Sequence, residues 1–120
     1  MRMTRLYTGQ DGQTHFEDID VEFHTDARGV SQSDPVVVAA PYFSKASPPG
    51  TPQSVAFHNA PRRQYVLVLA GVMEIEVGSG EKREFRAGEI VLAEDLDGQG
   101  HMTRVPGDSE RLAMILPLEG

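Results

Sequence analysis

Cysteine is absent from the 120 residues of this chain, and its absence excludes several kinds of site at once. Disulfides, zinc–thiolate centres, iron–sulfur clusters and thiol nucleophiles all require cysteine sulfur, so none of them can form here. Long apolar runs are lacking too, because no stretch approaches the roughly 20 residues that span a bilayer. We therefore expect a cytoplasmic protein with no membrane partner.

Positive charge is also scarce. The 11 Lys and Arg residues stand against 18 Asp and Glu residues, which gives a net charge of −7. Binding to nucleic acid depends on Lys and Arg side chains that neutralise phosphates, and the largest basic cluster in this chain is the pair Arg62-Arg63. The composition therefore predicts no nucleic-acid partner and no patch for anionic membranes.

Glycine and proline, 12 and 8 in number, divide the chain into short segments rich in Val, Ile, Phe and Leu, which are typical of β-strands. Apolar residues alternate with polar ones in Ile19–Phe23, as in a half-buried strand. Tyr65–Ala70 is apolar throughout, which predicts a central strand covered on both faces. The expected strands are His15–Phe23, Val36–Phe43, Gln53–His58, Arg63–Ala70, Val72–Val77, Lys82–Phe85, Glu89–Glu94, Gly100–Val105 and Arg111–Leu118.

Length and strand spacing predict one all-β domain over residues 1–120. A chain of this length matches the usual size of a single domain, and about nine short strands at regular spacing favour a β-sandwich or a barrel. Residues 1–14 are interpreted as an N-terminal extension, and the Pro- and Gly-rich segment 47–52 as a surface loop.

Two of the four histidines carry the strongest functional signal. His15 and His24 lie in the acidic N-terminal third of the chain and are expected to be solvated or structural. His58 and His101 instead lie in the region 55–104, where glycines recur near the ends of expected strands. An unperturbed imidazole titrates near neutral pH, so both can exchange protons with a substrate.

The first spacing pattern is His58-x5-Gln64-x6-Gly71. It resembles the first motif of the cupin family, G-x5-H-x-H-x3,4-E-x6-G. In this alignment Gln64 takes the glutamate position and Ala60 takes the position of the second histidine. The chain thus keeps one of the two imidazoles of this motif and has an amide in place of the carboxylate.

The second pattern is Gly88-x5-Glu94-x3-Gly98-x2-His101. It resembles the second cupin motif, G-x5-P-x-G-x2-H-x3-N, with an insertion of two residues. Glu94 replaces the proline, and Val105 stands at the asparagine position. The resemblance implies a cupin-type double-stranded β-barrel, or jelly roll, a fold that commonly pairs into homodimers.

The resemblance further implies that His58, Gln64 and His101 occupy metal-ligand positions. Typical metal-binding cupins offer three histidines and one glutamate, so this depleted set predicts weak binding of a divalent metal such as Zn, Mn, Fe or Ni. The alternative is a metal-free cavity in which the three side chains hydrogen-bond one another or a ligand. The sequence leaves both alternatives open.

Alternation along the expected strands predicts which residues share the cavity wall. If Gln64 points inward, Val66 and Val68 do so too, and Thr103 accompanies His101 in the same way. The cavity would then be mostly apolar with a few polar groups, which is the usual form of a small-molecule site. Further candidates for its rim are Tyr42, Phe43, Phe57 and Arg63.

The acidic segment Glu94-Asp95-Leu96-Asp97 precedes His101. A carboxylate in this segment can orient one imidazole nitrogen and raise the basicity of the other. The alternative interpretation is a solvated turn.

The sequence thus predicts a small-molecule-binding protein, and an enzyme of the isomerase, cyclase or lyase type. His58 and His101 are its candidate acid–base groups or metal ligands. A non-catalytic ligand-binding cupin without metal and a metal-dependent oxygenase are the alternatives. The apolar segment Ile19–Phe23 and the family resemblance also predict a homodimer that pairs through strand edges. The candidate ligand-binding residues are Gln64, Tyr42, Phe43, Arg63 and Thr103.

Overall fold

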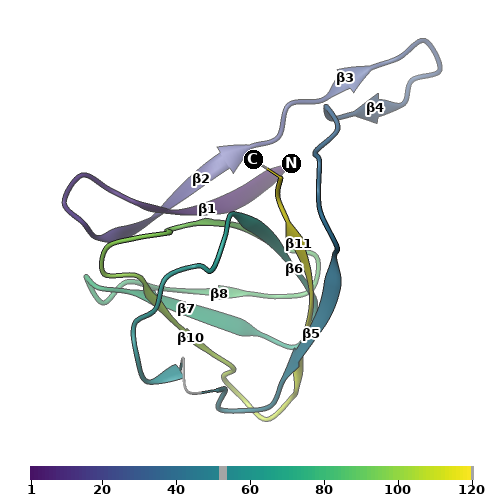
Figure 1. Ribbon diagram of the computed structural model, residues 1–120. Helices are drawn as coiled ribbons and strands as arrows, with labels where there is room; N and C mark the ends of the chain where they lie inside the picture. Colours follow the sequence, from purple (N-terminus) through teal and green to yellow (C-terminus); the bar gives the residue numbers. More distant parts are fainter. Residues whose placement is uncertain (52–53, 120) are drawn as a thin grey trace.

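The computed structural model describes residues 1–51 and 54–119, in which eleven β-strands and no α-helix occur (Figure 1). The expected all-β domain is therefore confirmed. In chain order the strands are β1 (Arg2–Thr8), β2 (Thr14–Asp20), β3 (His24–Thr25), β4 (Ser31–Gln32), β5 (Tyr42–Ala46), β6 (Gln64–Ala70), β7 (Met73–Val77), β8 (Lys82–Phe85), β9 (Ile90–Glu94), β10 (His101–Arg104) and β11 (Arg111–Pro117).

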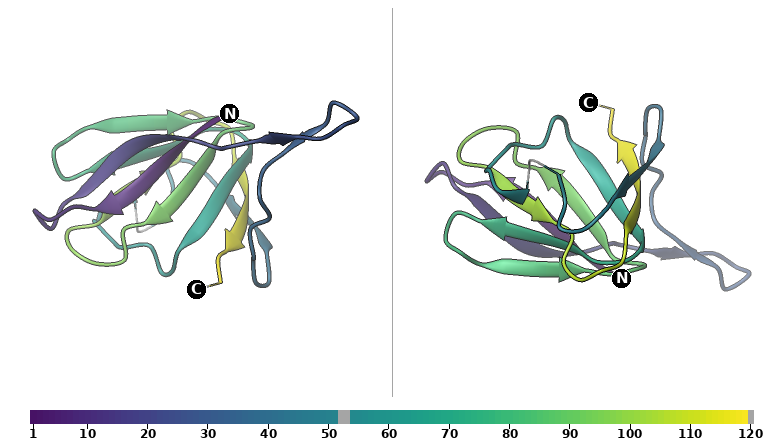
Figure 2. Two further views of the ribbon diagram at one scale, coloured as in Figure 1. Left: turned by 90° about the horizontal axis from the view of Figure 1, so that it is seen from above. Right: turned by 90° about the horizontal axis from the view of Figure 1, so that it is seen from below.

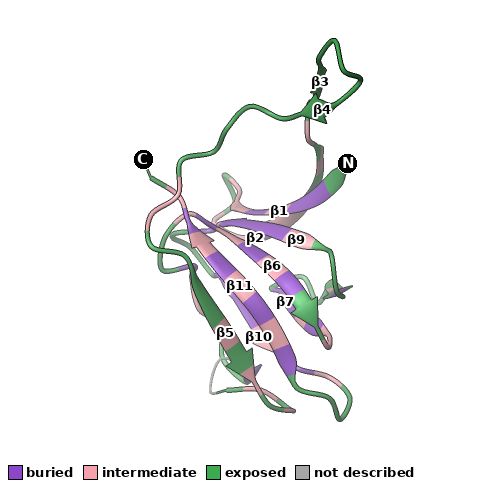
Figure 3. Ribbon diagram, turned by 90° about the vertical axis from the view of Figure 1, so that its right-hand side faces the viewer, coloured by how far each residue is buried: buried purple, intermediate pink, exposed green. Residues whose placement is uncertain are grey.

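Nine of these strands form two sheets that enclose the core. The larger sheet has six strands in the order β2-β1-β9-β6-β11-β5, and the smaller sheet has three in the order β10-β7-β8. The hairpin β3–β4 extends away from both sheets (Figure 2), and its strand residues are exposed (Figure 3). Among the described strands, hydrogen bonds do not close the two sheets into one barrel, so the finer prediction of a jelly roll is not confirmed.

Alternation along each strand decides which face is buried. In β7 the three apolar residues are buried, whereas Glu74 and Glu76 are only partly covered. Both glutamates accept hydrogen bonds from Nη1 of Arg104 on the neighbouring strand β10, at 3.3 and 2.6 Å. The apolar side chains of β7 therefore pack into the core, while its charged side chains form ion pairs on the outer face of the smaller sheet.

The N-terminal residues are part of the sheet, which corrects the interpretation of residues 1–14 as an extension. β1 lies between β2 and β9, antiparallel to the first and parallel to the second. Leu6 is 0% exposed and Thr14 is 1% exposed. The segment was missed because Leu6 is its only large apolar residue on the inner face, so its sequence shows too little apolar alternation to predict a strand.

The expected strand Val36–Phe43 begins later in the chain than predicted. Residues Val36–Pro41 form only a single bridge, between Val38 and Leu118, and the regular strand β5 begins at Tyr42. Ala40 has a φ of 49°, a left-handed conformation that an extended strand does not contain, and Pro41 has no N–H to donate. These two residues therefore separate the bridge from the strand.

The segment 47–58 contains no regular strand where the structure describes it. Residues 47–51 form the expected surface loop, whereas residues 52 and 53 lie outside the described part of the chain. Between residues 54 and 58, only His58 pairs with another strand, through an isolated bridge to His101. The predicted strand Gln53–His58 is therefore reduced to this one bridge. The other seven expected strands are found, with small shifts at their ends.

β6 is central in the larger sheet but is covered on one face only, which corrects the expectation of two covered faces. Its residues alternate between buried and partly exposed from Gln64 to Val68, and Leu69 is 39% exposed. On this outer face Tyr65 and Leu67 line a groove of about 450 Å³ together with residues of the segment that leads to β3. We call it the outer groove.

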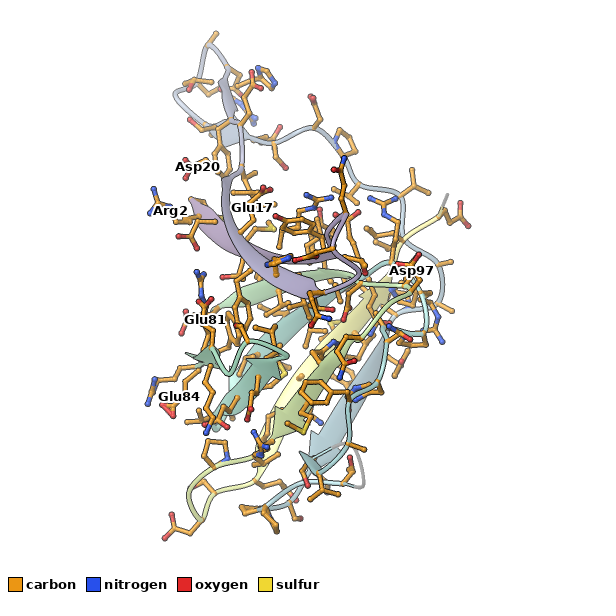
Figure 4. The ribbon with its side chains drawn as sticks, turned by 90° about the vertical axis from the view of Figure 1, so that its left-hand side faces the viewer. Arg2, Glu17, Asp20, Glu81, Glu84 and Asp97 are labelled. Atoms are coloured by element: carbon orange, nitrogen blue, oxygen red, sulfur yellow. The ribbon has the colours of Figure 1, made fainter. Side chains whose placement is uncertain are left out.

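Ion pairs join the strands at the periphery. Arg2 on β1 lies 3.6 Å from Asp20 on β2. Both side chains are labelled in Figure 4. Arg83 on β8 reaches Asp18 at 2.8 Å and so links the two sheets. Such exposed pairs contribute little stability, about 0–1 kcal/mol each.

Within the described ranges, no helix has the length and apolar character needed to cross a bilayer.

Candidate functional site

A cavity of about 140 Å³ lies between the two sheets and is called the inner cavity here. Gln64 and Val66 of β6 line it from the larger sheet, and His101 and Thr103 of β10 line it from the smaller one. These are the pairs that alternation predicts. The remaining lining residues are Leu6, Ala60, Pro61, Met73, Ile75, Val91, Ala93, Arg111 and Ile115.

The inner cavity has the composition of a small-molecule site. Apolar side chains from both sheets make most of its wall, and four polar side chains, Gln64, His101, Thr103 and Arg111, interrupt it. A cavity of about 150 Å³ is large enough for a molecule the size of benzene. The ligand that fits inside is therefore a small one.

His101 forms a buried pair with Asp95. Its Nδ1 lies 2.5 Å from Asp95 Oδ2, and the hydroxyl of Thr14 donates to the same oxygen at 3.1 Å. Asp95 is 0% exposed and His101 is 6% exposed. Asp95 therefore takes the orienting role that the sequence suggested for a carboxylate of the acidic segment, while its neighbour Asp97 is exposed.

The pair fixes how the imidazole presents itself to the cavity. An ionised carboxylate only accepts hydrogen bonds, so Nδ1 of His101 carries the proton in this contact. The other ring nitrogen, Nε2, has no hydrogen-bond partner among the described residues. The arrangement is that of a histidine base oriented by a buried carboxylate.

His58 lies beside His101 and does not line the inner cavity. The two ring centroids are 4.5 Å apart, and the two backbones exchange N–H to carbonyl hydrogen bonds of 2.9 Å. Gly100 permits this approach, because it has a φ of 81° and a Cβ there would overlap the carbonyl oxygen of His58. The expectation that His58, Gln64 and His101 share one cavity therefore holds for two of the three residues.

Burial lowers the pKa of His58 below its ordinary value of 6.5, and the neighbouring His101 lowers it further. The unfolded chain therefore binds this proton at a higher pH than the folded one does. The stability that His58 contributes above pH 6.5 is lost as the pH falls through that value toward the lower folded pKa.

We expect His58→Asn to flatten the pH dependence of the melting temperature between about pH 7.5 and pH 5, because asparagine does not titrate there. Thermal unfolding followed by circular dichroism at several pH values measures it. His24→Asn, at an exposed histidine of the β3–β4 hairpin, is the matched control and should keep the wild-type slope. Equal slopes for the wild type and His58→Asn would contradict the assignment.

Three of the candidate rim residues lie outside the inner cavity. Arg63 donates from Nε to Glu94 at 2.6 Å, because alternation places it on the opposite face from Gln64. Phe43 is 70% exposed, and Phe57 is 37% exposed. None of the three lines the cavity. Their role in ligand binding stays a prediction that the cavity lining does not support.

Tyr42 stands next to the polar wall of the cavity without lining it. Nη1 of Arg62 lies 3.5 Å from the Tyr42 hydroxyl and 3.4 Å from Oε1 of Gln64. Arg62 thus connects the cavity-lining amide to the tyrosine. Both contacts are long, so they orient these side chains only weakly.

Arg111 is the cavity residue that sequence reasoning missed. It is 9% exposed, its Nη2 donates to Ser44 Oγ at 3.0 Å, and its Nε is buried without a hydrogen-bond partner. The signal was present in β11, where Arg111 shares its parity with the buried residues Ala113 and Ile115. An arginine at an inward position of an apolar strand is uncommon and marks a possible site.

The residues implied as metal ligands do not fit a divalent cation well. His58 does not line the cavity, and the amide oxygen of Gln64 is an uncharged metal ligand. The guanidinium of Arg111 lines the same cavity and repels a cation. Within residues 1–51 and 54–119, no group of three or more His, Cys, Asp or Glu side chains is placed to hold a metal ion. Weak metal binding stays a prediction, and metal analysis of the purified protein tests it.

Comparisons with known proteins do not assign the chain to a family. No protein-family model matches it, and no curated protein matches it. The fold and the inner cavity nevertheless define a class of protein. That class is a small all-β domain with an internal, mostly apolar cavity that contains a carboxylate-oriented histidine.

Proposed function

We propose that the protein binds a small molecule in the inner cavity and that His101 acts on it as a general acid–base, as in an isomerase, cyclase or lyase. The observation that carries this proposal is the buried contact between Asp95 and Nδ1 of His101. It leaves Nε2 as the nitrogen that can take a proton from a bound ligand. A positioned base of this kind typically accelerates a proton transfer by about 10²–10⁴-fold.

A cupin-type fold is part of the same proposal. Its support is the conformation of three motif glycines, since Gly71, Gly88 and Gly98 all have positive φ angles at turns. A Cβ at Gly71 or Gly98 would overlap a backbone oxygen, so these turns require glycine. An experimental structure that places the strands in another topology would remove this support.

The homodimer and the cytoplasmic location stay predictions. Val21 and Phe23, from the apolar segment that motivated the dimer, line the outer groove, and Phe23 is 43% exposed. A dimer in solution would have twice the 13.1 kDa mass of one chain, which light scattering measures directly.

The proposed function is tested with a library of small fragments. Fragments that bind the inner cavity should shift the ¹⁵N resonance of His101 Nε2 and the amides of residues that line the cavity. The spectrum should also show the proton of the neutral ring on Nδ1. A proton on Nε2, or a library in which no fragment perturbs the cavity, would contradict the proposal.

Exchange of ligand C–H protons for solvent deuterium distinguishes an enzyme from a non-catalytic binding protein. Binding fragments are incubated in D₂O with the wild type and with His101→Gln, and the exchange of their weakly acidic C–H protons is followed. We expect the exchange rate with His101→Gln to be about 10²-fold or more below the rate with the wild type. Binding without any exchange would favour the non-catalytic alternative.

A further inference from the structure

The inner cavity contains a cation that is paired with no anion among the residues that the structure describes. Arg111 is nine-tenths buried, and no Asp or Glu among the residues of the inner cavity faces it. In the described part of the chain, no carboxylate lies within ion-pair distance of its guanidinium. In contrast, exposed arginines such as Arg28 and Arg86 have acidic partners at 2.6 and 3.0 Å.

The donors of Arg111 are also incompletely used. Ser44 accepts one hydrogen bond from Nη2, and Nε is buried with no acceptor. A guanidinium has five N–H donors in a rigid fork, and this fork matches the two oxygens of a carboxylate. A buried charged donor without an acceptor costs stability of the folded state, and an anion in the cavity would remove this cost.

The pKa of Arg111 is lowered by burial, which reflects the same cost of removing the guanidinium from water. Arginine nevertheless remains protonated at every physiological pH. The cavity therefore carries a permanent positive charge within a protein whose net charge is −7. A buried positive site of this kind selects an anionic ligand against a neutral ligand of the same shape.

We propose that the ligand of the inner cavity is a small carboxylate with an apolar body, and that Arg111 holds its carboxylate group. This inference rests on the proposed function, because it names the class of ligand on which His101 acts. The apolar wall formed by residues such as Val66, Ile75 and Ile115 accommodates the body. The volume of about 140 Å³ limits that body to a few carbon atoms or one small ring.

The two sides of the cavity then have different roles. Arg111 enters from β11 of the larger sheet and provides the charge that binds and orients. His101 enters from β10 of the smaller sheet and provides the lone pair of Nε2. Gln64 and Thr103 are the other polar side chains that line the cavity, and each can hydrogen-bond a ligand oxygen.

The test compares carboxylates with amides of the same shape. Propionate, butyrate and benzoate are titrated into the wild-type protein, and so are propionamide, butyramide and benzamide. Dissociation constants come from the amide resonances of cavity residues. We expect each acid to bind about ten- to a hundredfold more tightly than its amide, since hydrogen bonds to a charged group are the stronger ones.

Three variants assign this preference to Arg111. Arg111→Met should remove it and Arg111→Lys should retain part of it, because lysine keeps the charge and loses the fork. Arg86→Met is the matched control directly after β8, because Arg86 pairs there with the exposed Glu84, and it should bind like the wild type. Glu84 is labelled in Figure 4. Melting temperatures of all variants are recorded alongside.

The outcomes separate this inference from the proposed function. Acids and amides that bind the wild-type cavity equally well would overturn the role of Arg111 and leave a small-molecule site in place. A preference for acids that persists in Arg111→Met would also overturn it. Failure of every acid and every amide to perturb the cavity would count against both. If Arg111→Met does not fold, equal binding of acids and amides by the wild type would still overturn the inference, and Arg111→Lys would still test the residue.

Discussion

Replacing Asp95 with alanine is expected to lower the free energy of unfolding by about 3 kcal/mol. The substitution leaves Nδ1–H of His101 and the hydroxyl of Thr14 without an acceptor in a site that water does not reach. Asp95 Oδ1 has no partner of its own, so its removal offsets a part of the loss. The melting temperature should fall by roughly 10 °C in thermal denaturation.

Two further variants make the Asp95 experiment specific. Asp97→Ala, in the exposed turn two residues later (Figure 4), should change stability by less than about 0.5 kcal/mol. Asp95→Asn keeps the shape of the side chain, but its amide can donate to Nδ1 and so place the imidazole proton on Nε2. It should therefore retain much of the stability and lose most of the ligand C–H exchange.

The results that would contradict this role of Asp95 are direct. Wild-type stability in Asp95→Ala would mean that the contact with His101 contributes nothing to the fold. Wild-type exchange in Asp95→Asn would mean that His101 does not depend on this carboxylate for its orientation. A structural role alone predicts loss of stability without the selective loss of exchange, so the two variants distinguish positioning from packing.

Replacing Leu6 with alanine is expected to lower the free energy of unfolding by about 3–5 kcal/mol. Leu6 is 0% exposed and packs in the core between the two sheets, so the shortened side chain leaves a cavity that its neighbours do not fill. The melting temperature should fall by roughly 10–20 °C. Urea denaturation of the wild type and the variant measures the same change.

Leu96→Ala is the matched control for Leu6, because it removes the same atoms from a side chain that is 48% exposed. It should cost less than about 1 kcal/mol. Similar stability losses at the two positions would contradict the burial of Leu6 of β1 in the core. The result also bears on the site, since Leu6 lines the inner cavity.

Two sequence patterns explain how much of the fold was predictable. Short apolar segments between glycines and prolines identified the strands from β6 to β11, and period-two alternation placed Gln64 with Val66 and His101 with Thr103 on shared faces. Alternation is a local property, because successive side chains of a strand point to opposite sides whatever lies around it. These predictions therefore needed no knowledge of which strands become neighbours.

Segments with weak patterns were the ones that sequence reasoning missed. β1 has one large inward residue, Leu6, and it enters the sheet through a parallel pairing with β9. That pairing joins residues far apart in the sequence, and no local pattern reports it. The strand expected at Val36–Phe43 failed for the opposite reason, since the left-handed Ala40 interrupts a stretch whose composition is typical of a strand.

By itself the sequence determined an all-β class, most strand positions, the sharing of a face by paired residues, and the inward placement of His101 and Gln64. Only the tertiary structure decided that Asp95 is buried against His101, that His58 lies outside the inner cavity and that Arg111 lies inside it. The reason is physical. A sequence pattern states which side chains share a face, whereas the charge and burial of a site depend on what packs across from that face.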